Sequence, residues 1–586
     1  MRNWVWLAVI SLAAACLAIF ATTPPSPLPQ DAPDAAFSAS RAMVDIERVA
    51  SAPHPTGSEK HAEVRAYLVE RMTALGMEVS TQEAPLPERS AQRLAKWHEL
   101  AGSPMADDAP APSLVNITGI LRGSDPSLPA VMLMSHYDTV VGSPGAADDT
   151  AGVAVSLEVI RALKAAGPLR RDVVVLMTDA EELGLNGARY FFGEDPRRES
   201  IGTVINMEAR GSGGRTGLFE TSEQNGEAVR VFADSVSRPS GTSLSVIIYR
   251  LLPNNTDLTP ALDGDYASYN FAFIGRPGLY HSPDATPANL DQGSIQDMGA
   301  QVLSLSAALA DAETLPGRSP DLSFFDVFGL ATLAFAPGLG WLFLLAGLAG
   351  YVAAIVLPGR GKPDVKALLR GAGRGGALMV LVVLATWLLK LIAGLGSGEL
   401  AYYDGLAAIP RLEWVALLAS AAAAAVVLRA GSGKACDWAG FALVPFAIGI
   451  GLQIGLPSAA YIVTVPLMLA GLGALVFVTG GKAGKAVAAV TAVLVLAYNI
   501  GLAHQVMQGI GADVPMAVSL PVTLAAMALL PFWPAWPARR VWQASAALLI
   551  VAAAIALWVR LDPVADTVAV YAQAEGWKDK GAEAGE

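Results

Sequence analysis

Residues 131–152, VMLMSHYDTVVGSPGAADDTAG, place a histidine and several carboxylates directly after a short apolar run. The run VMLMS ends in a turn and is typical of a strand buried on both faces of a parallel sheet. His136 then lies at the carboxyl end of that strand, where open α/β sheets bind ligands. Asp148 precedes a segment with helical apolar spacing, so its carboxylate can reach the same sheet edge. This pair predicts a metal site whose other ligands lie downstream.

Asp138 stands two residues after His136 in the same turn. A carboxylate in this position can accept a hydrogen bond from the second ring nitrogen of His136, which fixes the tautomer that presents the other nitrogen to a metal. An isolated His-x-Asp pair is weak evidence for a metal site, so the other candidate ligands in the sequence decide whether it belongs to one. Asp149, next to Asp148, is the residue with which Asp148 is most easily confused.

Two adjacent glutamates, Glu181 and Glu182, follow the predicted strand 172–178. Successive side chains diverge in a strand or tight loop, so one carboxylate can ligate a metal while the other faces a water molecule. Alternatively, the two form a solvated acidic turn at the start of a helix, where the helix dipole favours negative charge. On these residues alone both interpretations are equally supported.

Two further predicted strands end in residues of the same types. The run at 203–207 leads to Glu208, and the run at 277–280 leads to His281. Four strand ends would then place a histidine or a carboxylate on the same rim of one sheet. The full set contains two imidazoles and three carboxylates: His136, Asp148, Glu182, Glu208 and His281. It suits two zinc ions about 3.5–4 Å apart that share one carboxylate.

Other reactive residues offer weaker signals. For His54, His61 and His98, a surface or helix-capping role is favoured over metal binding. Only two cysteines occur, Cys16 and Cys436, both in or beside apolar segments, and no G-x-S-x-G turn is present. A serine or cysteine nucleophile is therefore not expected.

The composition divides the chain into two unlike halves. Of all residues, 53% are hydrophobic and 16% charged, and the mean hydropathy is +0.44, which is too apolar for a soluble enzyme. The first half, to about residue 320, has mixed charges, whereas residues 324–560 form a succession of apolar runs. The net charge of −12 and the absence of a basic stripe exclude nucleic-acid binding.

The polar half, residues 37–320, alternates strand and helix patterns. Helices are predicted at 37–51 and 59–75, and strands at 113–121, 129–135, 172–178, 203–207 and 277–280. This alternation predicts an α/β domain with a doubly wound, mainly parallel sheet.

The apolar half predicts an all-α polytopic membrane domain of about eight helices within 324–560. Residues 1–22 contain a further apolar run, followed by a Pro-rich linker at 23–36; an uncleaved anchor is favoured over a cleaved signal peptide. Basic residues gather in alternate loops, at 360–374, 429–434, 482–485 and 539–540. By the positive-inside rule, the domain 37–320 and the tail 561–586 are extracytoplasmic. Lys390 and His504, in or near the ends of spans, have no assigned role.

As an ordered set, the segments SHYDTV, GAADDTAG, DAEELGLNGAR, INMEARG and LYHSPDAT resemble the zinc exopeptidase family of di-zinc aminopeptidases, glutamate carboxypeptidase and glutaminyl cyclase. With the anchor and the later spans, the chain resembles the branch of endoplasmic-reticulum metallopeptidases and vacuolar membrane proteases. The Ala- and Gly-rich composition and compact loops favour a bacterial member. The resemblance implies an extracytoplasmic peptidase domain that binds two zinc ions and takes peptides as substrates.

Carried onto matching positions, the resemblance implies that Asp148 bridges the two zinc ions. His136 and Glu208 would complete one site, and Glu182 and His281 the other; many soluble relatives have Asp where this chain has Glu208. Glu181 would be the general base and Asp138 the residue that orients His136. The implied activity is exopeptidase, with aminopeptidase favoured. A glutaminyl-cyclase-like acyltransferase and an inactive peptide-binding or scaffold protein in the membrane are the alternatives, and the roles of Arg210 and Asp257 and the oligomeric state stay open.

Overall fold

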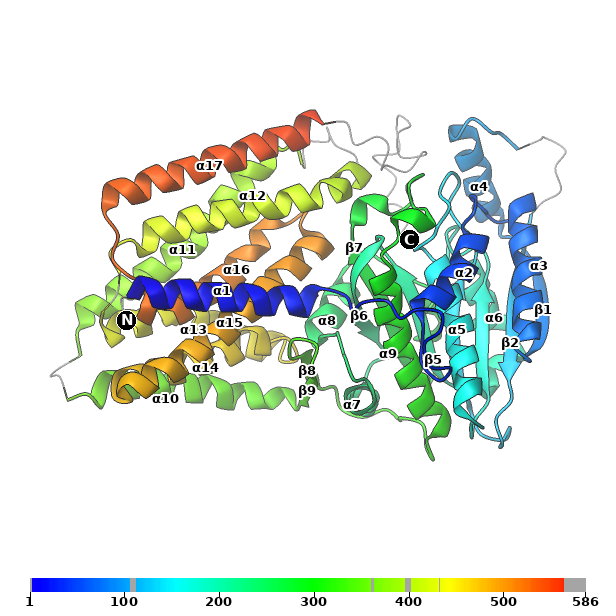
Figure 1. Ribbon diagram of the computed structural model, residues 1–586, viewed down its shortest axis with the longest axis horizontal. Helices are drawn as coiled ribbons and strands as arrows, with labels where there is room; N and C mark the ends of the chain where they lie inside the picture. The colour runs from blue at the N-terminus through cyan, green and yellow to red at the C-terminus, as the bar shows by residue number, and fades with distance from the viewer. Residues whose placement is uncertain (1–2, 106–111, 360–362, 396–401, 432, 563–586) are drawn as a thin grey trace. The chain divides into compact units, whose positions relative to one another are not determined.

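The computed structural model describes residues 3–105, 112–359, 363–395, 402–431 and 433–562, and the chain forms two compact units (Figure 1). One unit comprises the described residues of Thr23–Ala334 together with the short segment 402–407. The other comprises Met1–Thr22, Phe335–Leu400 and Ala408–Pro563. We call them the α/β unit and the helical unit. Of the predicted tail 561–586, residues 563–586 lie outside the described residues.

The α/β unit contains a seven-stranded mixed sheet and a two-stranded one. Its strands are β1 (Glu78–Pro85), β2 (Ser113–Leu121), β3 (Ala130–His136), β4 (Val173–Thr178), β5 (Ile201–Ala209), β6 (Gly213–Thr221), β7 (Ala267–Gly275), β8 (Ser323–Asp326) and β9 (Thr332–Phe335). Its helices are α2 (Ala39–Val49), α3 (Glu59–Ala74), α4 (Glu88–Leu100), α5 (Thr150–Ala166), α6 (Asn186–Glu194), α7 (Gly226–Ser235), α8 (Ser243–Leu251) and α9 (Gln292–Asp311).

The strand order of the large sheet is β1-β2-β4-β3-β5-β7-β6. Its four central strands, β4, β3, β5 and β7, run parallel, whereas β1, β2 and β6 pair antiparallel with their neighbours. The chain leaves β3 through α5 to β4 on one side and returns through α6 to β5 on the other side of β3. The carboxyl end of β3 is therefore a topological switch point, where open α/β sheets bind ligands.

Side chains of β3 alternate between two apolar cores. Val131 and Leu133 belong to the larger core, with residues of α2, α5 and α9, and Figure 1 shows α5 and α9 covering one face of the sheet. Met132 and Met134 belong to the smaller core, with Phe191 of α6. All seven residues of β3 are buried, because helices cover both of its faces.

The α/β architecture with helices on both sheet faces is confirmed, and one predicted strand is wrong. Residues 277–280 do not form a strand; a short 3-10 helix, Pro277–Leu279, follows the true strand β7. Phe271 and Phe273 of β7 are fully buried, but polar residues interrupt its apolar run, which hides the strand in the sequence.

The helical unit, within the described residues, contributes nine helices that are long and apolar enough to cross a bilayer, in agreement with a multi-pass membrane protein. They comprise α1 (Asn3–Thr22), α10 (Gly340–Val356), α11 (Val365–Ile392), α12 (Tyr402–Leu428), α13 (Ala435–Gly455), α14 (Tyr461–Thr479), α15 (Gly481–Ile510), α16 (Ser519–Leu529) with its flanking turns, and α17 (Ala538–Leu561). Helices α10 and α14 approach closely where Gly347 faces Gly471.

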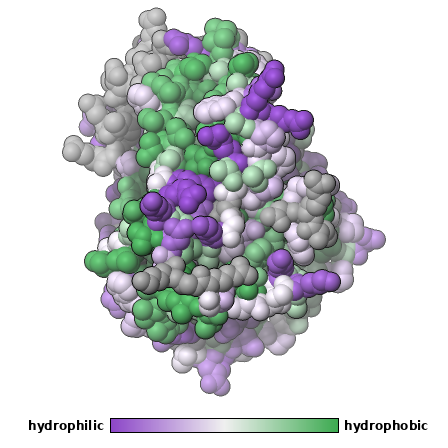
Figure 2. Space-filling view, turned by 90° about the vertical axis from the view of Figure 1, so that its left-hand side faces the viewer, coloured by the Kyte–Doolittle hydropathy of each residue, from purple (hydrophilic) through white to green (hydrophobic). Residues whose placement is uncertain are grey.

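Ion pairs join the N-terminal parts of α11 and α13 and the residues just before them. Lys434, before α13, lies 2.6 Å from Asp364, before α11, and Arg374 of α11 lies 2.6 Å from Asp437 of α13. Figure 2 views the end of the helical unit at which Figure 1 marks the N-terminus, and it shows hydrophilic side chains gathered among apolar ones. Charged loops of this kind end a span at the bilayer surface.

Candidate metal centre

The predicted ligands meet at the carboxyl end of β3 and its neighbours. His136 is the last residue of β3, Asp148 immediately precedes the N-cap of α5, and Glu208 is near the end of β5. Glu181 and Glu182 follow β4, and His281 follows the 3-10 helix after β7. The sheet thus brings together all five predicted ligands and the predicted base from segments far apart in the sequence.

Asp148 lies between the two histidines. Its Oδ1 is 3.2 Å from His136 Nε2, and its Oδ2 is 3.0 Å from His281 Nε2. The peptide bond between Asp148 and Asp149 is cis. Asp149 instead caps α5, since its carboxylate accepts the N–H groups of Gly152 at 3.1 Å and of His136 at 3.2 Å. Asp148, rather than Asp149, therefore faces both imidazoles.

The other carboxylates complete two overlapping groups. Potential ligand atoms lie within 4.8 Å of one another in His136, Asp148 and Glu208, and likewise in Asp148, Glu182 and His281. Glu182 Oε2 is 3.1 Å from His281 Nε2. A further group of this kind joins His136 with Glu181 and Glu182, and Glu181 Oε2 lies 3.9 Å from His136 Nε2. Two of these groups share Asp148.

Asp138 supports the site differently from the prediction. His136 Nδ1 lies 3.0 Å from the backbone carbonyl of Asp138 and 3.5 Å from its carboxylate. The carboxylate accepts the backbone N–H groups of Glu181 at 3.0 Å and Glu182 at 3.3 Å. Although burial favours the neutral acid, His136 and the N–H of Glu181 hold the pKa of Asp138 below its usual value. This charged side chain thus fixes the backbone that carries both glutamates.

The site concentrates negative charge in a buried volume. Burial raises the pKa of Glu208 to about 8, and the charges of Asp148 and Asp257 add to this effect. Burial, with the charges of Glu208 and Glu182, also raises the pKa of Glu181 well above its usual value. Neighbouring carboxylates disfavour one another's ionised forms, and a divalent cation between them stabilises those forms.

The donor set fits zinc. Two imidazole nitrogens and several carboxylate oxygens are ligands that zinc prefers. Glu182 Oε1 is buried and has no hydrogen-bond partner within the described part of the chain, so it is available to a cation.

His281 has a backbone conformation unusual for a residue with a side chain, with φ +56°. Its ring stacks on Tyr280 at a centroid distance of 3.7 Å, and its Nδ1 lies 2.9 Å from the hydroxyl oxygen of Tyr403. Tyr403 was not predicted as part of the site, because it stands 122 residues later in a segment with membrane-helix composition. No local spacing pattern links it to His281.

Two of the histidines for which a surface or helix-capping role was favoured are buried. His54 and His61 are 0% and 1% exposed. His61 stacks on Tyr137 at 4.6 Å and lies 3.1 Å from Asp179, so it packs beneath the loop that bears the glutamates. His54 Nδ1 donates a hydrogen bond at 3.0 Å to the carbonyl of Ala52.

The remaining residues noted in the sequence have ordinary partners. Asp257 is buried and accepts a hydrogen bond from the hydroxyl of Thr178, while Arg210 donates to the hydroxyl of Tyr402 at 2.6 Å. In the helical unit, Lys390 donates to the carbonyl of Asp513, and His504 lies 2.8 Å from Glu413.

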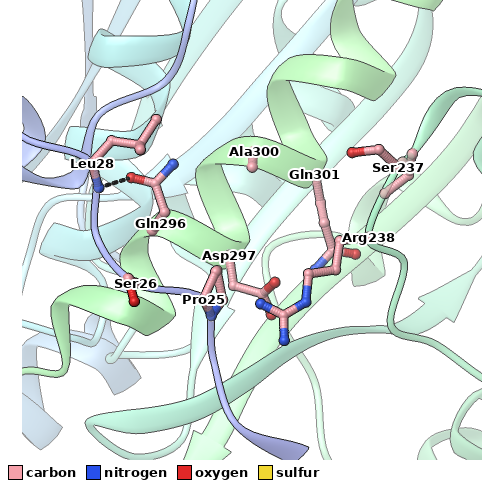
Figure 3. Close-up of a pocket in the computed structure, with 10 residues that line it drawn as sticks. Pro25, Ser26, Leu28, Ser237, Arg238, Gln296, Asp297, Ala300 and Gln301 are labelled. Carbon is pink, nitrogen blue, oxygen red and sulfur yellow. Dashed lines mark hydrogen bonds between the residues drawn. The ribbon is translucent and has the colours of Figure 1, made fainter. Parts of the chain in front are cut away.

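A separate cavity of about 220 Å³ lies between the linker after α1 and helix α9 (Figure 3). The backbone N–H of Leu28 donates to Gln296 at 2.9 Å on its wall, and Asp297 and Arg238 also line it. None of the predicted metal ligands is among its lining residues.

Part of the chain is similar to known peptidases. Residues 116–306 match the model of peptidase family M28. Endoplasmic reticulum metallopeptidase 1 of Mus musculus is 30% identical over 236 residues, which are 39% of this chain and 26% of that protein. A vacuolar membrane protease of Lachancea thermotolerans is 28% identical over 299 residues, covering 49% of this chain and 30% of that protein.

The similarity thus spans about a quarter to a third of the length of these curated relatives. Among solved structures, a zinc aminopeptidase from Bacillus subtilis is similar at 16% identity and a TM-score of 0.38, covering 49% of this chain and 99% of that one. All the predicted metal ligands lie within residues 116–306, the part matched by the family model. Residues 116–306 are therefore the part of the chain that is similar to peptidase family M28.

Proposed function

We propose that the chain is a membrane-anchored, zinc-dependent exopeptidase that acts as an aminopeptidase. The observation that carries the proposal is the pair of ligand groups that share Asp148 inside the M28 domain. These groups suit two zinc ions, one held by His136 and Glu208 and the other by Glu182 and His281. The names of the relatives, metallopeptidase and membrane protease, support peptide hydrolysis at a membrane.

Bound zinc would supply a Lewis acid that polarises the scissile carbonyl and acidifies a water molecule. Glu181 would take the proton of that water on its carboxylate and pass it to the leaving amine. Its carboxylate lies 3.9 Å from His136 Nε2, and its pKa is raised above its usual value, both of which suit a proton acceptor at the metal centre. Asp138 keeps Glu181 in place through the backbone N–H groups.

We further propose that the peptidase domain is extracytoplasmic. The basic segments alternate along the helical unit, and the described residues of two of them, 360–374 and 429–434, lie close together at one end of its bundle, where Lys434 pairs with Asp364 and Arg374 with Asp437. The positive-inside rule assigns that end to the cytoplasm and the opposite ends of the spans to the other side.

The proposal is tested on the full chain in detergent micelles. We expect zinc to copurify, aminoacyl-anilides to be cleaved and amino-blocked peptides to resist cleavage. Replacing Glu181 by Gln should lower kcat by about 10²- to 10⁴-fold, the usual contribution of a general base, without removing zinc. The matched control is Glu220→Gln, because Glu220 is also buried but belongs to none of the ligand groups.

Three results would overturn parts of the proposal. Less than one zinc per chain after preparation in zinc-containing buffer would exclude a metallopeptidase. Equal activity in the Glu181→Gln and Glu220→Gln variants would exclude Glu181 as the base. Cyclisation of peptides with amino-terminal glutamine, without hydrolysis of any peptide, would show an acyltransferase instead.

A further inference from the structure

The α/β unit includes a short segment that follows α11 by sequence. Residues 402–407 belong to this unit, whereas the helix α12 that begins at Tyr402 continues beyond them into the helical unit. From the composition, the α/β domain was predicted to end at residue 320. The structure thus adds a distant piece of chain to the unit that holds the metal centre.

This segment packs against the turn that carries His281. A Cβ atom added to Gly278, in the 3-10 helix before His281, would lie 2.8 Å from the Cα of Ala407. The ring of Tyr403 lies 6.1 Å from Tyr280 and 5.8 Å from His281, measured between centroids. Tyr403 is 9% exposed and His281 is 8% exposed. The contact is therefore close and shielded from water.

The surroundings of His281 Nε2 decide whether Nδ1 donates or accepts its hydrogen bond with Tyr403. Nε2 of His281 faces Asp148 and Glu182 at 3.0 and 3.1 Å, so this is the nitrogen that would offer its lone pair to a metal. In a neutral imidazole the proton then resides on Nδ1. That N–H donates to the hydroxyl oxygen of Tyr403 at 2.9 Å.

The backbone of His281 needs such support. A non-glycine residue at φ +56° costs free energy, and it persists only where its surroundings hold it. Tyr280 stacks on one face of the imidazole, and Tyr403 holds its Nδ1. Metal-binding histidines depend on such a partner, and its loss typically lowers metal affinity or activity 10- to 100-fold.

We propose that Tyr403 is a positioning residue for His281, so that the metal centre is completed by the first turn of the membrane-spanning helix α12. Tyr403 accepts the Nδ1–H bond, fixes the tautomer of His281 and directs Nε2 at the ligand group of Asp148 and Glu182. This proposal rests on the proposed zinc-peptidase function. It assigns to the start of a membrane helix a role in the peptidase site.

The test compares full-length variants in detergent micelles. Tyr403→Phe removes only the hydroxyl group. Tyr402→Phe controls for changes at the start of α12, since Tyr402 is 52% exposed and its hydroxyl contacts Arg210 rather than a ligand. Tyr266→Phe controls for loss of a tyrosine hydroxyl elsewhere in the same unit, where it bonds the carbonyl of Arg198. Folding is checked by size-exclusion chromatography and far-ultraviolet circular dichroism.

The first readout is zinc per chain after dialysis against a series of buffered free-zinc concentrations. Tyr403→Phe should need about 10- to 100-fold more free zinc to fill one of its sites, whereas both controls should match the wild type. The second readout is the visible spectrum of the cobalt-substituted protein, which should change only in Tyr403→Phe. Where zinc is saturating, kcat should fall with KM nearly unchanged.

Wild-type zinc affinity and an unchanged cobalt spectrum in Tyr403→Phe would overturn the positioning role. That result leaves the proposed function standing if the wild type binds zinc and cleaves peptides; a wild type without zinc refutes the function itself. If Tyr403→Phe does not accumulate folded, Tyr403→Gln and Tyr403→Leu provide the comparison. Their volumes are similar and only the amide accepts a hydrogen bond, so equal zinc affinities in this pair would also overturn the proposal.

Discussion

Replacing Asp138 by Asn tests how the buried carboxylate beneath the glutamates supports the metal centre. The side chain is 1% exposed and accepts the backbone N–H groups of Glu181 and Glu182. Asparagine has the same shape but only one acceptor oxygen, so its NH₂ group must face an N–H or the Nδ1 side of His136. The variant therefore loses one charge-assisted hydrogen bond and the negative charge beside His136.

The magnitude follows from two independent estimates. A hydrogen bond to a charged group contributes about 1.5–3 kcal/mol. Loss of a residue that orients metal ligands typically costs about 10- to 100-fold in metal affinity, equivalent to about 1.4–2.8 kcal/mol. We therefore expect Asp138→Asn to weaken zinc binding about 10- to 100-fold, with a lower melting temperature.

The assay measures zinc occupancy against buffered free zinc, together with thermal unfolding of the full chain in detergent. Asp45→Asn is the matched control, because Asp45 is 2% exposed and accepts hydrogen bonds from Tyr67 and Arg71 but belongs to none of the ligand groups. This control should unfold at a lower temperature with unchanged zinc affinity. If Asp138→Asn behaves in the same way, Asp138 supports the fold alone and the reasoning is refuted.

Two further predictions concern stability. Burial lowers the pKa of His54 from 6.5 to about 4, so the folded state resists its protonation, and stability present above pH 6.5 is lost as the pH falls towards 4, by about 3 kcal/mol at most. The melting temperature of the wild type should accordingly fall more steeply between pH 6.5 and 4 than that of His54→Asn; parallel curves would contradict this. In the helical unit, a Cβ added to Gly471 would lie 2.3 Å from the carbonyl oxygen of Gly347, whereas one added to Gly376 meets nothing within 4 Å. Gly471→Ala should lower the melting temperature and Gly376→Ala should not, since alanine favours a helix by about 1 kcal/mol; equal effects would show that the contact between α10 and α14 is unimportant.

The sequence predicted the strands that are buried on both faces. The runs of β3 and β4 are continuous and apolar, because helices cover both sides of each strand. The edge strand β1, EVSTQEAP, was missed because its residues are mostly exposed and polar. The order of strands in the sheet also lay beyond the sequence pattern, since it depends on contacts between distant elements.

The ligand set could be proposed from the sequence because each of its residues follows a recognisable run or motif. The contacts of Asp138 could not be predicted in the same way. The spacing of the two residues does not reveal whether the backbone carbonyl or the carboxylate of Asp138 is nearer to Nδ1 of His136. The burial of His61 was not predicted, because it depends on stacking against Tyr137, a contact between segments far apart in the chain. Tyr403 was not predicted either, because its contact with His281 also joins segments far apart in the chain.

The α/β unit is discontinuous, and this has a consequence for its synthesis. A ribosome adds about 5–20 residues per second, so Tyr403, 122 residues after His281, emerges roughly 6 to 24 s later. During that interval α10 and α11 are also made. The nascent chain thus contains all five predicted metal ligands before it contains the tyrosine that contacts His281. If Tyr403 positions His281 as proposed, the metal centre reaches its full zinc affinity only after two further predicted spans have been produced.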